Sequence, residues 1–347
     1  LRIYTAELGI VAGEYAGLPI NESWQAALKN LQKHRQLAAE ALSTRPEAKA
    51  ELAPAQKAAR SALTAVEASL AEGFDARHKA AVQTLLTQFG ALAADLDAGR
   101  LDVAKLLTRQ QALASQAFIA IADLNGDTGL LLDPEAATYF SIIAGLQAAP
   151  RVEDALSELS SIARAAAVDD LAAVAAALTR YREHAGLMLQ QMQAAQRAGG
   201  ALEQDLSQMV GQALKQRQLV DETMQAAAQD VNYPLDKLAA SFSTAAALQA
   251  ELSLRVLQSL KTELERRSKA TAFKRNTLLV LLPLLLGVLS LVMLRAIRQL
   301  LIPVGQMIDV TERIAAGDLS HAVPQGRRDE MGRVLLALAH LQQRLRQ

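Results

Sequence analysis

Apolar residues recur at helical spacing along most of the 347-residue chain. Before residue 277 this pattern stops only at short stretches rich in Gly, Pro, Asn and Asp, which predict about eight helical segments. The last segment runs on from Leu235 without a breaker, and residues 1–13 are expected to pair with it. The predicted breaks are residues 17–19, 44–46, 73–75, 97–99, 123–140, 150, 199–200 and 232–234.

Residues 277–294 form an uncharged apolar run of 18 residues, TLLVLLPLLLGVLSLVML. About 20 such residues span a bilayer, so the run predicts a transmembrane helix in contact with membrane lipid; a buried core helix is the alternative. Pro283 and Gly287 are tolerated in membrane helices. Charge alone does not orient this helix, because basic residues lie on both sides of it. These residues are Lys269, Lys274, Arg275, Arg295 and Arg298.

Beyond the apolar run, two short segments carry apolar residues at a spacing of about 3.5, which is typical of coiled coils. Two helices of this length cannot bury their apolar seams alone, so they predict a homodimer. Gly317 can end the first helix in a left-handed conformation, and Asp329 can cap the second. The spaced positions are Val304, Met307, Thr311 and Ile314, followed by Met331, Val334, Leu335, Leu338, Leu341 and Leu345.

Within this region, Pro303, the run IAAGDL (314–319) and the run DEMG (329–332) resemble a HAMP domain in order and spacing. The resemblance implies that residues 295–347 are cytoplasmic, form a parallel four-helix coiled coil in a dimer, and relay signals in a bacterial receptor. It also implies a structural contact between Pro303 and Glu330, and it places residues 1–276 outside the membrane. The expected relay residues are Pro303, Val304, Met307, Ile314, Gly317, Asp318, Leu319, Glu330, Met331, Gly332, Leu335 and Leu338.

Composition narrows the fold and the function. The chain has 36 basic and 36 acidic residues, which argues against a nucleic-acid-binding surface. Hydrophobic residues make up 51% but aromatic residues only 3%, a balance that favours long helices and an all-α fold. Without cysteine the chain has no disulfide and no thiolate site. About 276 residues before the membrane helix predict two stacked four-helix bundles, or one very tall bundle.

The stretch DLNGDTGLLLDPEAATYF (123–140) begins like a calcium-binding loop, with Asp123, Asn125 and Asp127 at alternate positions. An EF-hand needs glycine at position 6 and glutamate at position 12, where this chain has Thr128 and Pro134. The stretch is therefore interpreted as a polar turn at 125–127 followed by a helix start at Asp133-Pro134-Glu135.

The same stretch, together with residues 14–20 and the helix entering the membrane, is similar to the helical sensor regions of methyl-accepting chemotaxis proteins. That resemblance implies an inner-membrane chemoreceptor with a periplasmic sensor, preceded by another membrane helix. Its implied partners are a small-molecule ligand or a ligand-loaded periplasmic binding protein, and a chemotaxis kinase and adaptor reached through a domain after Gln347. Histidine kinases and diguanylate cyclases use the same front end, and a stalk that binds no small ligand is a further alternative.

Ligands enter helical bundles where polar groups interrupt an apolar seam. Turn and cap chemistry, or a place in the core, is the alternative for each such residue. Histidines without metal-ligand spacing, and the absence of any catalytic constellation, predict no metal, no cofactor and no enzyme activity. The ligand-site candidates are Asn125, Asp127, Asp133, Thr138, Tyr139, Glu14, Tyr15, Asn21 and Trp24, with Arg109 and Arg151 as partners for a carboxylate.

Overall fold

The computed structural model describes residues 2–70, 74–199, 203–230, 232–324 and 330–346. Within these residues the secondary structure is helical and contains no sheet, which confirms the predicted all-α fold. The chain divides into two compact units, residues 2–272 and residues 273–347. Helix α9 (Leu235–Ala315) contributes residues to both units.

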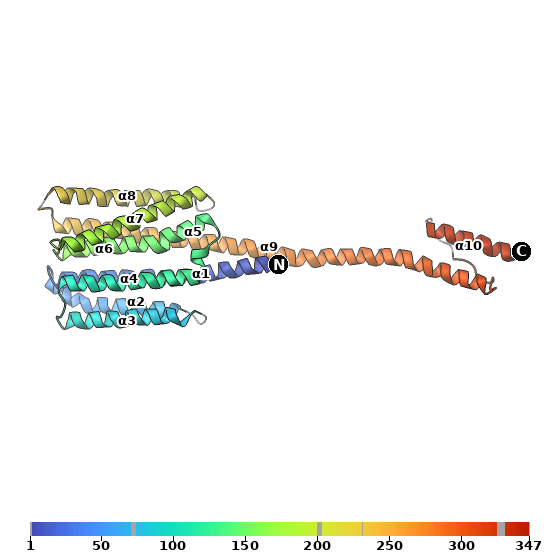
Figure 1. Ribbon diagram of the computed structural model, residues 1–347, viewed down its shortest axis with the longest axis horizontal. Coiled ribbons are helices and arrows are strands. Elements are labelled where there is room, and N and C mark those ends of the chain that lie inside the picture. Colours follow the sequence, from blue (N-terminus) through green and yellow to red (C-terminus); the bar gives the residue numbers. More distant parts are fainter. Residues whose placement is uncertain (1, 71–73, 200–202, 231, 325–329, 347) are drawn as a thin grey trace. The chain divides into compact units, whose positions relative to one another are not determined.

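Four helices form the first bundle of the unit at 2–272 (Figure 1). Its core is made of aliphatic and aromatic side chains from every helix, among them Trp24, Leu63, Phe89 and Ile121. Asp102 begins one of the helices by accepting a hydrogen bond from the Lys105 amide at 2.8 Å. The helices are α1 (Arg2–Ala41), α2 (Lys49–Ser69), α3 (Ala76–Asp97) and α4 (Val103–Asp127), with a 3₁₀ turn η1 (Pro46–Ala48) after α1.

A second bundle follows from α6 (Ala149–Arg164), α7 (Leu171–Ala198), α8 (Glu203–Gln229) and the first part of α9. The link from α4 consists of η2 (Leu130–Leu132), α5 (Ala136–Ile142) and a π-helical turn η3 (Ile143–Ala148). In that turn Gly145 lies so close to α9 that an added Cβ would be 2.2 Å from Val256 Cγ1. The turn therefore depends on glycine for its close approach to α9.

The two bundles lie side by side, joined where α1 packs against α6 (Figure 1). Helix α1 contributes to both cores: Val11 and Leu18 belong to the second, and Ile20 and Trp24 to the first. The number of bundles in the first predicted arrangement is right, but the predicted stacking is wrong, because the two bundles lie alongside each other along their helices.

The predicted helix break at residues 17–19 is wrong, because α1 continues through Pro19. The glycines in this part of α1 serve close packing. A Cβ on Gly13 would lie 3.0 Å from the Thr128 carbonyl oxygen, and one on Gly17 would lie 2.8 Å from Thr128 Oγ1. Small residues here let α1 approach the end of α4 within contact distance.

In the unit at 273–347, α9 carries the apolar run of residues 277–294, whose side chains are exposed. By length and composition this helix can cross a membrane. Gly317 follows its end with a φ of 79°, and the Asp318 amide donates to the Arg313 carbonyl at 3.0 Å. This geometry confirms the predicted left-handed cap at Gly317.

Candidate coupling site in the helical unit

Glu14 of α1 is fully buried, and neither of its carboxylate oxygens has a hydrogen-bond partner among the described residues. Burial raises the pKa of this carboxyl from its ordinary 4.5 to about 7. The Asp133 carboxylate contributes to this rise in pKa, and the Arg267 guanidinium opposes it. A buried carboxyl of this kind exchanges its proton near neutral pH.

Arg267 of α9 ion-pairs with Asp133 in the link between η2 and α5, with Nη1 and Oδ2 2.8 Å apart. The other Asp133 oxygen accepts from the Glu135 amide at 2.8 Å, which holds the carboxylate in place. The Asp133 side chain is inaccessible, and that of Arg267 is 14% exposed. Breaking one partner of such a buried pair costs several kcal/mol, about 3–5, so α9 is firmly attached here.

Two further contacts join α1 directly to α9. The Tyr15 hydroxyl donates to Glu265 at 3.0 Å, and the Thr271 hydroxyl donates to Glu7 at 3.2 Å. These hydrogen bonds lie on either side of Glu14 along α1. They confirm the predicted pairing of the first segment with the last. A displacement of α1 must therefore be felt by the part of α9 nearest to residue 272.

A third group of buried polar atoms connects α1 to α4. Asn21 Nδ2 donates to Asn125 Oδ1 at 2.7 Å and to the Gly17 carbonyl at 2.9 Å. Within the described residues, Asn125 Nδ2 and Thr138 Oγ1 are buried without hydrogen-bond partners. Each unsatisfied buried polar group costs about 1–3 kcal/mol, so a polar ligand atom that reached either of these two atoms would be stabilised by it.

Several predicted candidates lie elsewhere. Asp127 accepts from His78 Nε2 at 2.8 Å and pairs with Arg77 at the start of α3. The predicted turn at 125–127 is wrong, because α4 continues to Asp127 and Asn125 lies inside it. Likewise, α5 begins at Ala136 with Glu135 as N-cap, so Asp133 does not cap it.

The remaining candidates are also dispersed. Arg109 pairs with Asp95 at 2.5 Å, Arg151 lies 4.8 Å from the Phe118 ring centroid, and Trp24 is in the first core. Tyr139 is half-buried with its edge against Phe140. Neither arginine therefore faces the Glu14 cluster.

Sequence reasoning missed the cation of this site. In the sequence, the run 263–267 (ELERR) is typical of a solvated helix surface with ion pairs along the helix, but Glu263 is buried and Arg267 is nearly so. Residue type and spacing along the run carry no sign of this, because the partner of Arg267 lies 134 positions earlier. Only the packing of α9 onto the link between η2 and α5 reveals it.

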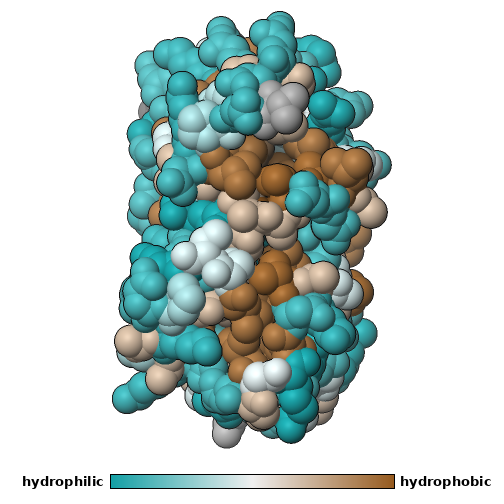
Figure 2. Space-filling model, turned by 90° about the vertical axis from the view of Figure 1, so that its left-hand side faces the viewer, coloured by the Kyte–Doolittle hydropathy of each residue, from teal (hydrophilic) through white to brown (hydrophobic). Residues whose placement is uncertain are grey.

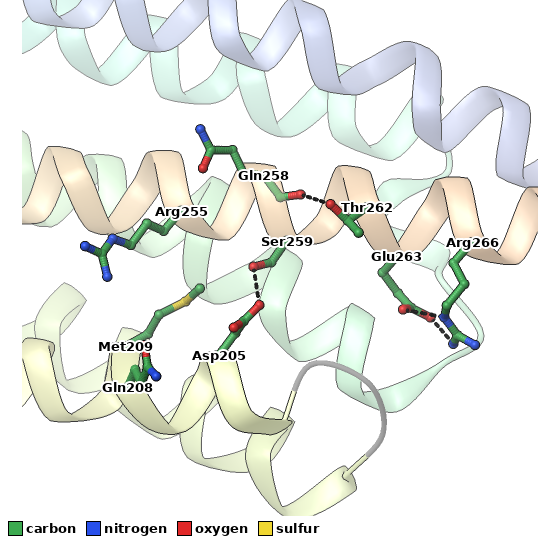
Figure 3. A pocket seen from close by; sticks show the side chains of 9 residues that line it. All are labelled: Asp205, Gln208, Met209, Arg255, Gln258, Ser259, Thr262, Glu263 and Arg266. Carbon is green, nitrogen blue, oxygen red and sulfur yellow. Dashed lines mark hydrogen bonds and ion pairs between the residues drawn. The ribbon is translucent and has the colours of Figure 1, made fainter.

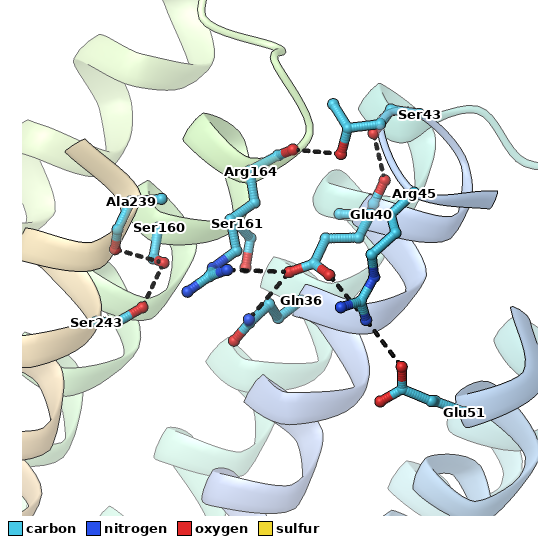
Figure 4. A network of polar contacts seen from close by, with 12 residues as sticks. Gln36, Glu40, Ser43, Arg45, Glu51, Ser160, Ser161, Arg164, Ala239 and Ser243 are labelled. Carbon is cyan, nitrogen blue, oxygen red and sulfur yellow. Dashed lines mark hydrogen bonds and ion pairs between the residues drawn. The ribbon is translucent and has the colours of Figure 1, made fainter. Parts of the chain in front are cut away.

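At the other end of α1, a polar network holds the two bundles together (Figure 4). The Glu40 carboxylate of α1 lies 3.2 Å from Arg45 and 3.5 Å from Arg164 of α6. Further along the same interface, the buried Arg35 of α1 pairs with Asp154 of α6 at 3.0 Å. These ion pairs join the two bundles near the C-terminal end of α1.

Between α8 and α9 lies a groove of about 390 Å³ (Figure 3). Its ionic groups are already partnered: Ser259 donates to Asp205 at 3.2 Å, and Arg266 donates to Glu263 at 2.9 Å. The groove lies directly against α9, but none of these charges lacks a partner. Among the described residues, no cluster of His, Asp or Glu could hold a metal ion.

In the unit at 273–347, α10 (Glu330–Arg346) packs on the segment that follows α9. Gln342 Nε2 donates to the carbonyls of Leu319 (3.1 Å) and His321 (2.7 Å). Val310 and Leu335 are buried, although heptad spacing did not select Val310 or Gln342. The side chain of Pro303 and the whole of Asp329 lie outside the described part of the chain. The predicted contact between Pro303 and Glu330, and the predicted helix cap at Asp329, therefore stay predictions.

Many of the expected relay positions remain open to solvent in the single chain, as apolar seams that need a second copy would. Gly332 and Leu335 are buried, whereas Gly317 and Glu330 are exposed. Val304, Val334, Leu341 and Leu345 are exposed as well, and Met307, Ile314, Asp318, Leu319, Met331 and Leu338 are half-buried.

These features define a class: a helical unit joined by one long helix, apolar enough to cross a membrane, to a short two-helix module. Residues 295–347 match the family model described as HAMP domain. The match confirms the resemblance seen in the sequence, and with the apolar run it indicates a membrane-bound signal-transduction receptor, a class in which HAMP domains act in dimers. Neither a curated protein nor a solved structure matches the chain.

Proposed function

We propose that this chain is the sensory, membrane and relay portion of a dimeric bacterial chemoreceptor, with residues 1–276 on the periplasmic side of the inner membrane. The observation that carries the proposal is the attachment of α9 to α1 through Tyr15 and Thr271, and to the link between η2 and α5 through Arg267. Helix α9 then continues into the apolar run and the HAMP residues. In this role the chain relays a conformational change and catalyses no reaction.

The relay works by differential affinity. A stimulus that binds one arrangement of the bundles better than another shifts the population toward that arrangement. Helix displacements of about 1–2 Å are the usual scale of such switches. The ion pair of Arg267 with Asp133 transfers such a displacement from the α4–α5 link to α9. In the HAMP dimer, the exposed apolar seams of α9 and α10 would pack against the same seams of the second copy.

Cross-linking tests the relay, and the chain's lack of cysteine makes it a clean background. The variant Tyr15→Cys/Glu265→Cys, joined by a short bis-maleimide, locks α1 to α9 in a chain fused after Gln347 to a chemoreceptor signalling domain. Stimulus-dependent kinase activity in membranes is expected to disappear. The pair Gln56→Cys/Asp97→Cys, at a 3.1 Å contact between α2 and the end of α3, is the control and should leave the response intact.

A full response in the locked α1–α9 receptor would overturn the relay. Sidedness is tested separately with a membrane-impermeant maleimide on intact spheroplasts. Thr84→Cys, on the exposed face of α3, should be labelled, and Ser320→Cys, after α9, should be protected until the cells are lysed. The reverse pattern would contradict the periplasmic placement of the helical unit.

The output class is a separate question from the relay. A histidine kinase or a diguanylate cyclase would use the same contacts between α1 and α9. Chemotaxis is favoured by the resemblance of the segment at 126–140 to chemoreceptor sensor regions. The outputs are distinguished by their own domains, because a histidine kinase and a diguanylate cyclase each carry a catalytic domain and a chemoreceptor carries an adaptor-binding domain.

A further inference from the structure

A cavity of about 530 Å³ lies where α4 and α7 begin, at the junction of the two bundles. This volume is within the range of about 300–1,000 Å³ that small-molecule sites occupy. Its walls come from both bundles and from the turns between helices. The lining residues are Leu42, Leu101, Asp102, Val103, Ala104, Leu107, Ala167, Asp170 and Ala173.

The walls of the cavity are mostly aliphatic. Leu101 belongs to the first core and Leu107 to the second, while Val103 and Ala167 pack against both. Figure 2 views this end of the bundles face on and shows hydrophobic surface gathered in the middle of the face between hydrophilic borders. An apolar body placed in the cavity would therefore contact both cores at once.

The charged side chains of the cavity determine which charge a bound ligand can have. The ionisable side chains that line the cavity are two carboxylates, Asp102 and Asp170. Asp102 is compensated by Lys105, 3.1 Å away. Asp170 accepts from the Ala173 amide at 3.0 Å and has no cation partner among the described residues. Its neighbour Asp169 adds a second negative charge, and the positive end of α7 offsets only about half of one.

We propose that this cavity binds a small organic cation with an aliphatic body, whose ammonium group pairs with Asp170. The apolar walls would cover the hydrocarbon part, and the carboxylate at the rim would replace part of the water lost by the ammonium. This proposal supplies a ligand class for the receptor proposed above and rests on that function only for its signalling effect. Because α4 and α7 belong to different bundles, an occupant wedges between them.

Binding is measured by isothermal titration calorimetry on the full chain in lipid nanodiscs, with heats from empty nanodiscs subtracted. The probes are cyclohexylamine, cyclohexanol and cyclohexanecarboxylate, which share a body and differ in charge. The amine is expected to bind most tightly and the carboxylate least. Asp170→Asn keeps the N-cap, because Asn caps as well as Asp, and should weaken amine binding about tenfold. Asp169→Asn is the matched control and should change binding by less than about twofold.

A second pair of variants tests the cavity itself. Ala173→Leu fills it and should abolish binding of the amine and the alcohol, whereas Ala172→Leu, on the exposed face beside it, should not. Equal affinity for the three probes, or amine binding that survives Ala173→Leu, would overturn the site. Binding as expected without a change in the kinase output of the fused receptor would support the site and contradict the receptor function.

Discussion

Replacing Glu14 with Gln tests whether the coupling site holds a carboxyl that is costly to ionise. Gln has nearly the shape of the protonated carboxyl and cannot become charged. The pKa of Glu14 is about 7 in the folded chain against an ordinary 4.5. A raised folded pKa means that the folded state holds the proton more tightly than the unfolded state. The stability from this group is therefore complete below pH 4.5 and is lost as the pH rises to about 7.

The magnitude follows from the shift. Each pKa unit corresponds to about 1.4 kcal/mol, so the full difference amounts to about 3 kcal/mol. Glu135, which is partly open to solvent, lies at the edge of the cluster beside Arg267. Screening at that edge lowers the expected value to about 2 kcal/mol. At pH 8 the variant Glu14→Gln should be more stable than the parent by about this amount, and at pH 4.5 the two should be nearly equal.

A second buried group titrates in the opposite direction and masks this effect in the parent. Burial lowers the pKa of His34 to about 4 from its ordinary 6.5. Stability from His34 is therefore present above pH 6.5 and is lost as the pH falls toward 4. Between about pH 4.5 and 6.5 the two titrations offset each other. Burial also raises the pKa of Glu153 to about 8, so this carboxyl titrates in the same direction as Glu14 in both proteins. The difference between the Glu14→Gln and parent profiles, in which shared groups cancel, therefore isolates the contribution of Glu14.

Urea unfolding at a series of pH values measures both profiles. Trp24 is the single tryptophan, lies on the same helix as Glu14 and is 2% exposed, so its fluorescence reports unfolding of α1. Glu22→Gln, at an exposed position of α1, is the matched control and should follow the parent. If Glu14→Gln also runs parallel to the parent from pH 5 to 8, the charged carboxylate carries no penalty and the reasoning fails.

Three other substitutions have defined expectations. Arg267→Met leaves Asp133 buried without its cation, which should cost about 3 kcal/mol in urea unfolding; an unchanged midpoint would mean that the pair is not formed. Gly145→Ala forces a Cβ into Val256 and should lower stability by about 1–3 kcal/mol, measured as a lower Tm by circular dichroism. Gly317→Ala strains a left-handed residue and should cost about 1 kcal/mol, seen as faster hydrogen exchange at the end of α9, while exchange in the unit at 2–272 should not change.

Local signals account for the parts of the fold that sequence reasoning predicted. The breaks near Pro46, Asp75 and Pro234 follow from residues that cannot continue a helix or that cap the next one. The apolar run and the Gly317 cap are also local patterns. The same reasoning gave a wrong break at residues 17–19, because Gly17 is needed for close packing against Thr128 at the end of α4. Local composition does not distinguish a glycine that ends a helix from one that packs it.

In the candidate site, too, sequence reasoning predicted the residues that have a local signal and missed a partner that is set by packing between helices. Polar residues inside an apolar seam were recognisable at Glu14 and Asp133, and the structure brings these two within electrostatic reach of each other. Their cation was not recognisable, since Arg267 lies in a charge-rich run, residues 263–267, that is typical of a solvated helix surface. Asp127 and Arg109 have the right chemistry but face different helices. Which polar residues meet is decided by bundle packing, and spacing along one helix carries no information about it.

The contacts between α1 and α9 join residues 250 positions apart in one case and 264 in the other. During synthesis, all four helices of the first bundle exist before the first residue of α9 is made. The first bundle can therefore fold early, while the part of α1 that carries Glu14 waits for the final helix. Contacts that close such long loops form late in folding. The part of α1 that contacts α9 is therefore the last part of the helical unit to assemble.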